Sequence, residues 1–438
     1  MVVVPPWPGV YTVDSQAMLA SARAGRVSDW YSPVLVSLWR VVDAIGVPPS
    51  VVFLVSTVVV VVALLAIYRL ALPRVWAMVA TAGTVLFPPV YGLLGWVGRD
   101  VWFLALVLVA AAALGWASLV PERRVALLAV AWIAAWFAAD ARQNGFPVLA
   151  VVGGVTAWLV ASAWRHRVLL IGGAAVVAVV LGFGLQRAAH TVTVQRDFAP
   201  EQVVYFQDLL AVSLWIDESL VPPELLPSDR EDEVRRLWVP AQVGAVLFRE
   251  DPPVDYRPRR GHERRTRLLR DAWLDMITSH PIAYLAERGD LFRRLLGLGD
   301  TPPGAWFRES DQIRGISPGL RQQLPGLNDV RAAYLEAFES GEPGRGGPLH
   351  RPWIYVLLGL SGSIALIVTS SRLRVIGWTL LALQASLQSV LAFAAPLLEY
   401  RFQLFQIVLG IVAAVLGTHA LVTASGVARR RVLPGAPP

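Results

Sequence analysis

The sequence predicts an all-α polytopic membrane protein, and three observations lead to this fold class. Hydrophobic residues make up 55% of the 438 residues and charged residues only 16%, whereas about 25% of residues are charged in an average soluble domain. Apolar runs long enough to cross a bilayer, which takes about 20 residues, recur along the chain, as from Val51 to Ile67. Arginines concentrate in alternate loops between these runs, as the positive-inside rule requires.

The first part of the chain, residues 1–48, is predicted to be a loop outside the bilayer that contains an interfacial helix. The stretch from Val34 to Ile45 is apolar but short, and Arg40 and Asp43 interrupt it. A helix of this kind lies in the membrane interface and does not cross the bilayer.

Nine segments are predicted to cross the membrane. Six of them lie within residues 49–186 and three within residues 351–424, and residues 425–438 form a basic tail. These runs are too long and too numerous for the buried helices of a soluble core. The predicted spans are residues 51–70, 75–96, 101–120, 124–139, 146–164, 167–186, 352–371, 374–395 and 402–424.

Arginine placement predicts the orientation. One set of alternate loops, together with the tail, holds eleven arginines and a single carboxylate, Glu122, so these loops are expected to be cytoplasmic. The chain has no lysine, and its bias toward arginine, alanine and valine suggests a bacterial plasma membrane. The C-terminus is then cytoplasmic. The eleven arginines are Arg69, Arg74, Arg123, Arg124, Arg165, Arg167, Arg372, Arg374, Arg429, Arg430 and Arg431.

Nine spans with a cytoplasmic C-terminus place the N-terminus outside. The chain opens on Pro5, Pro6 and Pro8 and shows no apolar stretch of the kind found in a signal peptide. A tenth helix upstream of Met1 would place the N-terminus inside, and we keep this arrangement as an alternative.

Residues 187–350 are predicted to form an extracytoplasmic, mainly helical insert domain. They hold 21 arginines and 25 carboxylates, and the section from Glu263 to Leu298 carries apolar residues at near-helical spacing. An arginine-rich run at 257–270 is interleaved with acidic residues in this acidic region, so nucleic acid is not an expected partner, whereas membrane lipids are. The chain has no cysteine, and its six histidines form no ligand-spaced cluster, which argues against a zinc site.

The carboxylates outside the insert point to a functional site. Only seven occur there, and six of the seven fall on the predicted outer side. Ionisable groups near a membrane are costly to bury and commonly mark a site. The seven residues are Asp14, Asp29, Asp43, Asp100, Glu122, Asp140 and Glu399.

On this outer side, carboxylates recur beside arginines in four segments. An aspartate can accept a proton from a hydroxyl group as a general base, and an arginine can bind a phosphate with two parallel hydrogen bonds. Because the chain lacks lysine, any cationic side chain that holds a lipid phosphate must be arginine. The segments are residues 8–33, Gly95–Asp100, Asp140–Gly145 and Glu399–Arg401.

The order of these segments resembles the GT-C fold glycosyltransferases that use polyprenyl-phosphate sugars, the superfamily of protein O-mannosyltransferases and aminoarabinose transferases. The aspartate of the family's first outer loop is matched by Asp14, although Ser15 stands where the family commonly has glutamate, and Ser32 stands where a second motif has histidine. The matching segments are Tyr11–Ser15, Asp29–Leu35, Gly98–Phe103, Arg142–Gly145 and Ser279–Leu285.

The resemblance implies a GT-C-like bundle of about nine transmembrane helices. It also implies inverting transfer of a sugar from polyprenyl phosphate to an extracytoplasmic glycan, lipid or protein acceptor. Asp14 is the expected general base and Asp29 the alternative base, and Asp14 with Asp100 would hold a divalent cation, Mg²⁺ or Mn²⁺. The expected substrate and phosphate contacts are Arg99, Asp100, Arg142, Asn144, Glu399, Tyr400 and Arg401.

The sequence also allows two other functions. The departures from the family motifs allow a non-catalytic membrane scaffold whose outer domain binds a partner. A transporter or flippase of lipid-linked material is the second alternative, although the spans carry few charges at mid-depth.

Overall fold

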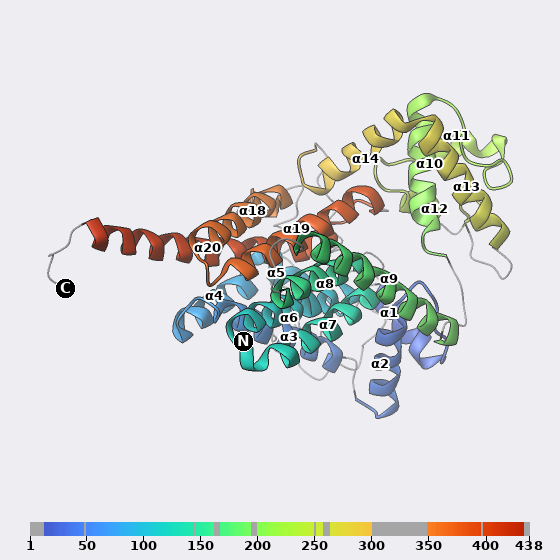
Figure 1. The fold of residues 1–438 in the computed structure, drawn as a ribbon. Coiled ribbons are helices and arrows are strands. Elements are labelled where there is room, and N and C mark those ends of the chain that lie inside the picture. The colour runs from blue at the N-terminus through green and yellow to red at the C-terminus, as the bar shows by residue number, and fades with distance from the viewer. Residues whose placement is uncertain are drawn as a thin grey trace, which may run out of the picture.

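A computed structural model gives the fold of the chain (Figure 1). The elements within the described ranges are all helices, in agreement with the predicted class. Figure 1 shows a bundle of long helices, with the helices of the insert standing together at one end of it. The structure describes residues 13–47, 50–142, 145–161, 167–193, 199–248, 251–256, 263–299, 348–395 and 397–432.

Within these ranges, seven helices are long and apolar enough to cross a membrane, as expected of a multi-pass membrane protein. Each corresponds to one of the spans predicted from the sequence. They are α3 (Ser50–Tyr68), α6 (Arg99–Leu119), α7 (Arg124–Ala141), α9 (Arg167–Thr193), α18 (Pro352–Thr369), α19 (Arg374–Ala394) and α20 (Leu404–Val432).

Two predicted spans differ from simple crossing helices. The segment 75–96 is divided into α4 (Arg74–Leu86) and α5 (Pro88–Leu94), which meet at an angle of 72°. Pro88 and Pro89 cause this break, because a proline disfavours helical backbone at the residue before it and cannot donate a helical hydrogen bond. Counted as one span, this bent pair gives an eighth crossing.

The segment 146–164 is the second difference. It forms α8 (Phe146–Val160), which has 15 residues and is therefore about 22 Å long, shorter than a bilayer core of about 30 Å. A Cβ atom added to Gly153 would lie 2.7 Å from the Ala174 carbonyl oxygen of α9, so the two backbones are in close contact. Of the nine predicted crossings, the described part of the chain therefore shows seven helices of sufficient length, or eight with the bent pair.

The first described segment carries two short helices, α1 (Val13–Arg23) and α2 (Pro33–Ala44). Ser32 is the N-cap of α2, and its hydroxyl oxygen accepts a hydrogen bond from the Leu35 amide at 3.0 Å. The same hydroxyl donates to the buried carboxylate of Asp140 at the end of α7. Asp140 therefore holds the start of α2 against the bundle.

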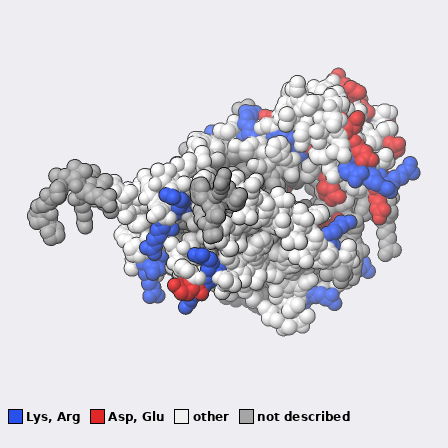
Figure 2. All heavy atoms as spheres, in the orientation of Figure 1, with Lys and Arg blue, Asp and Glu red and all other residues white. Residues whose placement is uncertain are grey.

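The arginine-rich loops lie at the end of the bundle away from the insert. The α3–α4, α6–α7 and α18–α19 connections carry Arg69, Arg74, Arg123, Arg372 and Arg374. Figure 2 shows mostly blue side chains at this end, whereas red side chains are mixed with blue ones on the insert. The two ends of the bundle therefore differ in charge as the sequence predicted.

Helices α18 and α20 pack closely through glycines. A Cβ atom added to Gly417 would lie 2.6 Å from the Gly362 carbonyl oxygen, and one added to Gly362 would overlap the Ala413 carbonyl. Gly410 faces the Tyr355 carbonyl in the same way. Small residues permit this close approach of backbones, which provides the packing energy between helices in a membrane.

We expect Gly362→Leu to separate α18 from α20 and to destabilise the bundle by about 1–3 kcal/mol or more, because the added side chain has no space. The measurement is the thermal aggregation temperature of the purified protein in detergent. Gly172→Leu is the matched control, since nothing lies within 4 Å of a Cβ at Gly172 in α9. Equal aggregation temperatures for the two variants would contradict the prediction.

The insert has its own hydrophobic cluster, which includes Phe206, Val246, Leu269 and Met276. The helix predicted from Glu263 to Leu298 is divided in two, because Pro281 begins a new helix after His280. Among the described residues of the insert, the α-helices are α10 (Gln202–Ile216), α11 (Glu231–Leu237), α12 (Gly244–Leu247), α13 (Glu263–Ser279) and α14 (Pro281–Leu295).

A buried ion pair joins two helices of the insert, and its arginine also binds the loop after α19. Arg288 of α14 lies 2.6 Å from Asp208 of α10, and both side chains are fully buried. Arg288 also donates to the carbonyl oxygen of Ala395 at 2.7 Å, and the Leu398 amide donates to the Ala241 carbonyl at 2.8 Å. The insert therefore holds the loop that joins α19 to α20.

Candidate functional site

Six of the predicted site residues converge at the insert end of the bundle into one group, here termed the charge cluster. They come from the start of α1, the start of α6, the residue that follows α7 and the loop before α20. The described members carry three positive and three negative charges, so the cluster is neutral overall. Its members are Asp14, Arg99, Asp100, Arg142, Glu399 and Arg401.

Arg401 is the centre of the charge cluster. Its Nη1 atom lies 2.9 Å from Asp14 Oδ2 and 3.7 Å from Asp100 Oδ2. Its Nε atom is paired with the Glu399 carboxylate. One guanidinium group is thus shared by carboxylates from three separate segments, and the Coulomb attraction within each pair is stronger in a buried site than at the surface.

Arg142 is held rigidly. Its Nη1 atom lies 2.6 Å from Asp100 Oδ1, and its guanidinium carbon lies 4.7 Å from the centre of the Phe402 ring and 5.9 Å from that of Phe103. The ion pair and the two rings occupy both the edge and the face of the guanidinium. The guanidinium of Arg142 is therefore already engaged by groups of the protein.

Arg99 differs from the other two arginines because it retains a hydrogen-bond donor. Its Nη2 atom lies 3.8 Å from Asp14, a long ion pair, and its Nη1 donates to the Trp30 carbonyl at 3.1 Å. Its buried Nε atom has no partner among the described atoms. Arg99 is also the first residue of α6, and Gly98 before it supplies no capping side chain, so the helix N-terminus favours an anion here.

Asp14 is the most exposed carboxylate of the cluster. Its side chain is 21% exposed, compared with 10% for Asp100 and 7% for Glu399. Burial raises the pKa of Asp14, but Arg401 and Arg99 outweigh burial and lower the pKa below the ordinary value. Asp14 is therefore ionised at neutral pH and can accept a proton.

Two predicted site residues lie outside the charge cluster, and a third is not among the described residues. Asp29 accepts a hydrogen bond from the Ala199 amide at 2.8 Å, which joins the first loop to the start of the insert. Tyr400 is buried beside the ring of His350, with 6.3 Å between the ring centres. Asn144 lies outside the described residues.

The cluster does not fit the divalent cation that the resemblance implies. Asp14 and Asp100, its expected ligands, both face the guanidinium of Arg401, and Arg142 also faces Asp100. A cation held by hard oxygen ligands would be repelled by these arginines. Among the residues that the structure describes, no group of three or more histidines and carboxylates is arranged to hold a metal ion.

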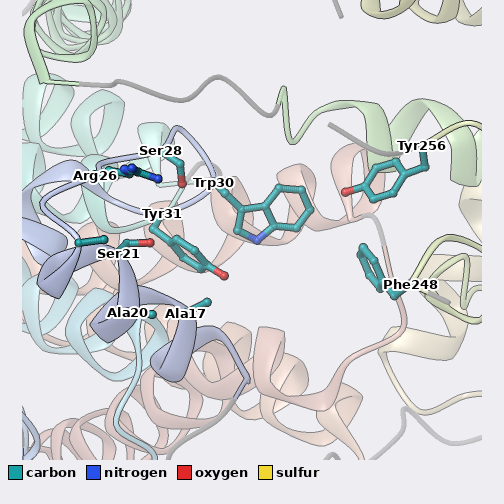
Figure 3. A pocket seen from close by; sticks show the side chains of 10 residues that line it. Ala17, Ala20, Ser21, Arg26, Ser28, Trp30, Tyr31, Phe248 and Tyr256 are labelled. Carbon is teal, nitrogen blue, oxygen red and sulfur yellow. The ribbon is translucent and has the colours of Figure 1, made fainter. Parts of the chain in front are cut away.

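An open pocket of about 460 Å³, here termed the aromatic pocket, lies between the first loop and the insert. Figure 3 shows Trp30 and Tyr31 on one side of it and Phe248 and Tyr256 on the other. The sequence motifs included the first two residues but not Phe248 or Tyr256, because no pattern in the insert marks them. The lining residues are Ala17, Ala20, Ser21, Ala24, Arg26, Ser28, Trp30, Tyr31, Phe248 and Tyr256.

The aromatic pocket and the charge cluster are neighbours. Trp30, which lines the pocket, accepts a hydrogen bond from Arg99 of the cluster. Burial raises the pKa of Tyr31, and the charge of Asp14 raises it further, so the phenol lies within electrostatic reach of Asp14. The hydrogen bond from Arg99 to Trp30 therefore connects the pocket to the charge cluster.

Comparison with family models, curated proteins and solved structures found no match to the chain. A fold alone does not specify a reaction, so the geometry of the cluster and the pocket is the basis for the function.

Proposed function

We propose that this chain is a membrane glycosyltransferase of the GT-C type, which transfers a glycosyl group from a polyprenyl-phosphate donor to an acceptor hydroxyl at the insert end of the bundle. The observation that carries the proposal is the pairing of Asp14 with Arg99. A partly exposed, ionised carboxylate lies beside an arginine with an unused donor. The aromatic pocket is connected to Arg99 through Trp30, whose carbonyl accepts a hydrogen bond from that arginine.

In this proposal, Arg99 binds the donor phosphate together with the N-terminus of α6. The acceptor hydroxyl transfers its proton to Asp14, and its oxygen forms a bond to the anomeric carbon. The bond from that carbon to the phosphate oxygen breaks, and polyprenyl phosphate leaves with the electron pair. Attack opposite the leaving group inverts the anomeric configuration.

The small free space within the charge cluster indicates which ion pair would break first when a donor binds. The cavity among its side chains, lined by Asp14, Arg99, Asp100 and Arg401 among others, is only about 10 Å³, enough for about one water molecule. A donor phosphate must therefore replace an existing contact. The Arg99–Asp14 pair at 3.8 Å is the longest of the described pairs within the charge cluster and would be the first to break.

This exchange would also improve Asp14 as a base. Arg99 is one of the cations that lower the pKa of Asp14. When the donor phosphate neutralises Arg99, the pKa of Asp14 rises toward the working pH, where a general base is most effective. Asp14 would keep Arg401, at 2.9 Å, as its positioning contact.

The test is donor consumption by the purified full chain in nanodiscs supplied with a polyprenyl-phosphate sugar. We expect Arg99→Gln to raise the donor KM by about 10–100-fold, because a charge-assisted hydrogen bond contributes about 1.5–3 kcal/mol. Arg23→Gln is the matched control, since Arg23 pairs with Asp43 on the exposed surface of the same loop region. An unchanged donor KM in Arg99→Gln would remove Arg99 from the proposal.

One observation favours the non-catalytic scaffold as a second candidate. The described charges of the cluster satisfy one another, as in a network that only fastens four segments together. In that case the wild-type chain would consume no donor, and substitutions in the cluster would change only its thermal stability.

A further inference from the structure

The floor of the aromatic pocket is one face of α1. Ala20 and Ser21 follow Ala17 by three and four residues, and Ala24, just after α1, follows them by four and three, so these four lining residues share that face. Asp14 precedes Ala17 by three residues and continues the same face toward the charge cluster. The small side chains leave space over this face of α1, and the face continues along the helix to the carboxylate of Asp14.

The walls of the pocket are aromatic and come from two parts of the chain. The rings of Trp30 and Phe248 lie 6.4 Å apart edge to face, and those of Phe248 and Tyr256 lie 5.7 Å apart. Trp30 belongs to the first loop and the other two residues to the insert. The volume of about 460 Å³ is within the usual range of about 300–1,000 Å³ for a small-molecule site.

The polar groups of the lining are mostly neutral hydroxyls. Ser21, Ser28, Tyr31 and Tyr256 each supply an oxygen that both donates and accepts hydrogen bonds. Arg26 is the single charged residue among the described lining residues. Flat apolar surfaces bordered by neutral hydroxyls match a ligand with apolar faces and a rim of hydroxyl groups.

We propose that the aromatic pocket is the acceptor site and that it binds a neutral carbohydrate, with a pyranose ring between Tyr31 and the Phe248–Tyr256 pair. This inference rests on the proposed function and specifies its acceptor class. The acceptor hydroxyl would project along the α1 face toward Asp14. The ring faces would contact the aromatic side chains, and the ring hydroxyls would pair with the hydroxyls of the lining.

Other acceptor classes fit this pocket less well. An acyl chain would leave the buried phenol and serine hydroxyls without partners, and each unpaired buried group costs about 1–3 kcal/mol. A strongly anionic acceptor would find only Arg26 as a counter-charge. A neutral sugar satisfies both the apolar and the hydroxyl-bearing surfaces.

The test is saturation-transfer-difference NMR on the full chain in nanodiscs, with a panel of methyl glycosides of neutral hexoses, pentoses and N-acetylhexosamines and their disaccharides at millimolar concentration. We expect saturation of the ring protons of at least one glycoside by the wild type. We expect Phe248→Ala and the pocket-filling Ala20→Leu to weaken that binding at least about tenfold, which is about 1.4 kcal/mol.

Two controls separate this inference from the proposed function. Phe393→Ala removes an aromatic ring of similar exposure, 58% against 53% for Phe248, and should leave glycoside binding unchanged. Asp14→Asn should bind glycosides but not transfer sugar. Failure of every glycoside to bind the wild type, or equal binding by wild type and Phe248→Ala, would overturn the inference. Glycoside binding without donor consumption would instead leave the pocket assigned and reject the transferase.

Discussion

Asp14→Asn is expected to lower the rate of glycosyl transfer by about 10²–10⁴-fold, the usual contribution of a general base. The amide cannot take the proton of the acceptor hydroxyl, but its oxygen can still accept a hydrogen bond from Arg401, which lies 2.9 Å from the carboxylate. We therefore expect kcat to fall while the donor KM changes little. The measurement is the steady-state rate of polyprenyl phosphate release in nanodiscs.

The control for Asp14→Asn is Asp43→Asn, the same chemical change in a carboxylate that pairs with Arg23 at the surface of α2. It should leave both kinetic constants unchanged, because an exposed ion pair contributes about 0–1 kcal/mol and lies outside the cluster. Normal turnover by Asp14→Asn would show that another group, such as Asp29, accepts the proton. Equal losses in the two variants would indicate a general effect on the first loop.

Arg288→Met is expected to destabilise the insert by about 3–5 kcal/mol, because it leaves the carboxylate of Asp208 buried without a counter-charge. Asp208 would keep only the hydrogen bond from the Trp273 indole, at 2.7 Å. The same substitution removes the contact of Arg288 with the Ala395 carbonyl. Limited proteolysis of the full chain over a temperature ramp would report the loss of protection in the insert.

A double variant distinguishes lost charge balance from lost packing. Arg288→Met combined with Asp208→Leu should recover most of the stability, since replacing a whole buried pair by apolar groups is often neutral. Arg293→Gln is the control on the same helix, because Arg293 forms an exposed pair with Asp290 and should cost less than about 1 kcal/mol. A small effect of Arg288→Met would show that Asp208 is protonated or hydrated without its partner.

The anchoring of the insert also concerns the candidate site. Ala395 and Leu398 are tied to the insert by hydrogen bonds, and Glu399 and Arg401 follow directly in the chain. Since Arg401 centres the charge cluster, movement of this loop would misplace its guanidinium. We therefore attribute a positioning role to the insert in addition to its share of the aromatic pocket.

The sequence by itself determined the class of the protein and the end of the bundle at which the described arginine-rich loops lie. Apolar runs and arginine-rich loops are local properties, because each run must satisfy its own backbone in the membrane and each loop carries its own charges. The same reasoning brought Asp100, Arg142 and Glu399 to one end of the bundle. The break before Pro88 also had a local cause, although the predicted span ran through it.

The tertiary structure alone decided which charges pair and which side chains form the pocket. Asp14 and Arg401 are 387 positions apart, and an ion pair depends on a separation of a few ångströms that no local pattern specifies. For the same reason Asp29 pairs with the start of the insert, and Phe248 and Tyr256 meet Trp30 across separate parts of the chain. Composition restricts each segment to a layer of the membrane, whereas only the packing of distant segments creates a site.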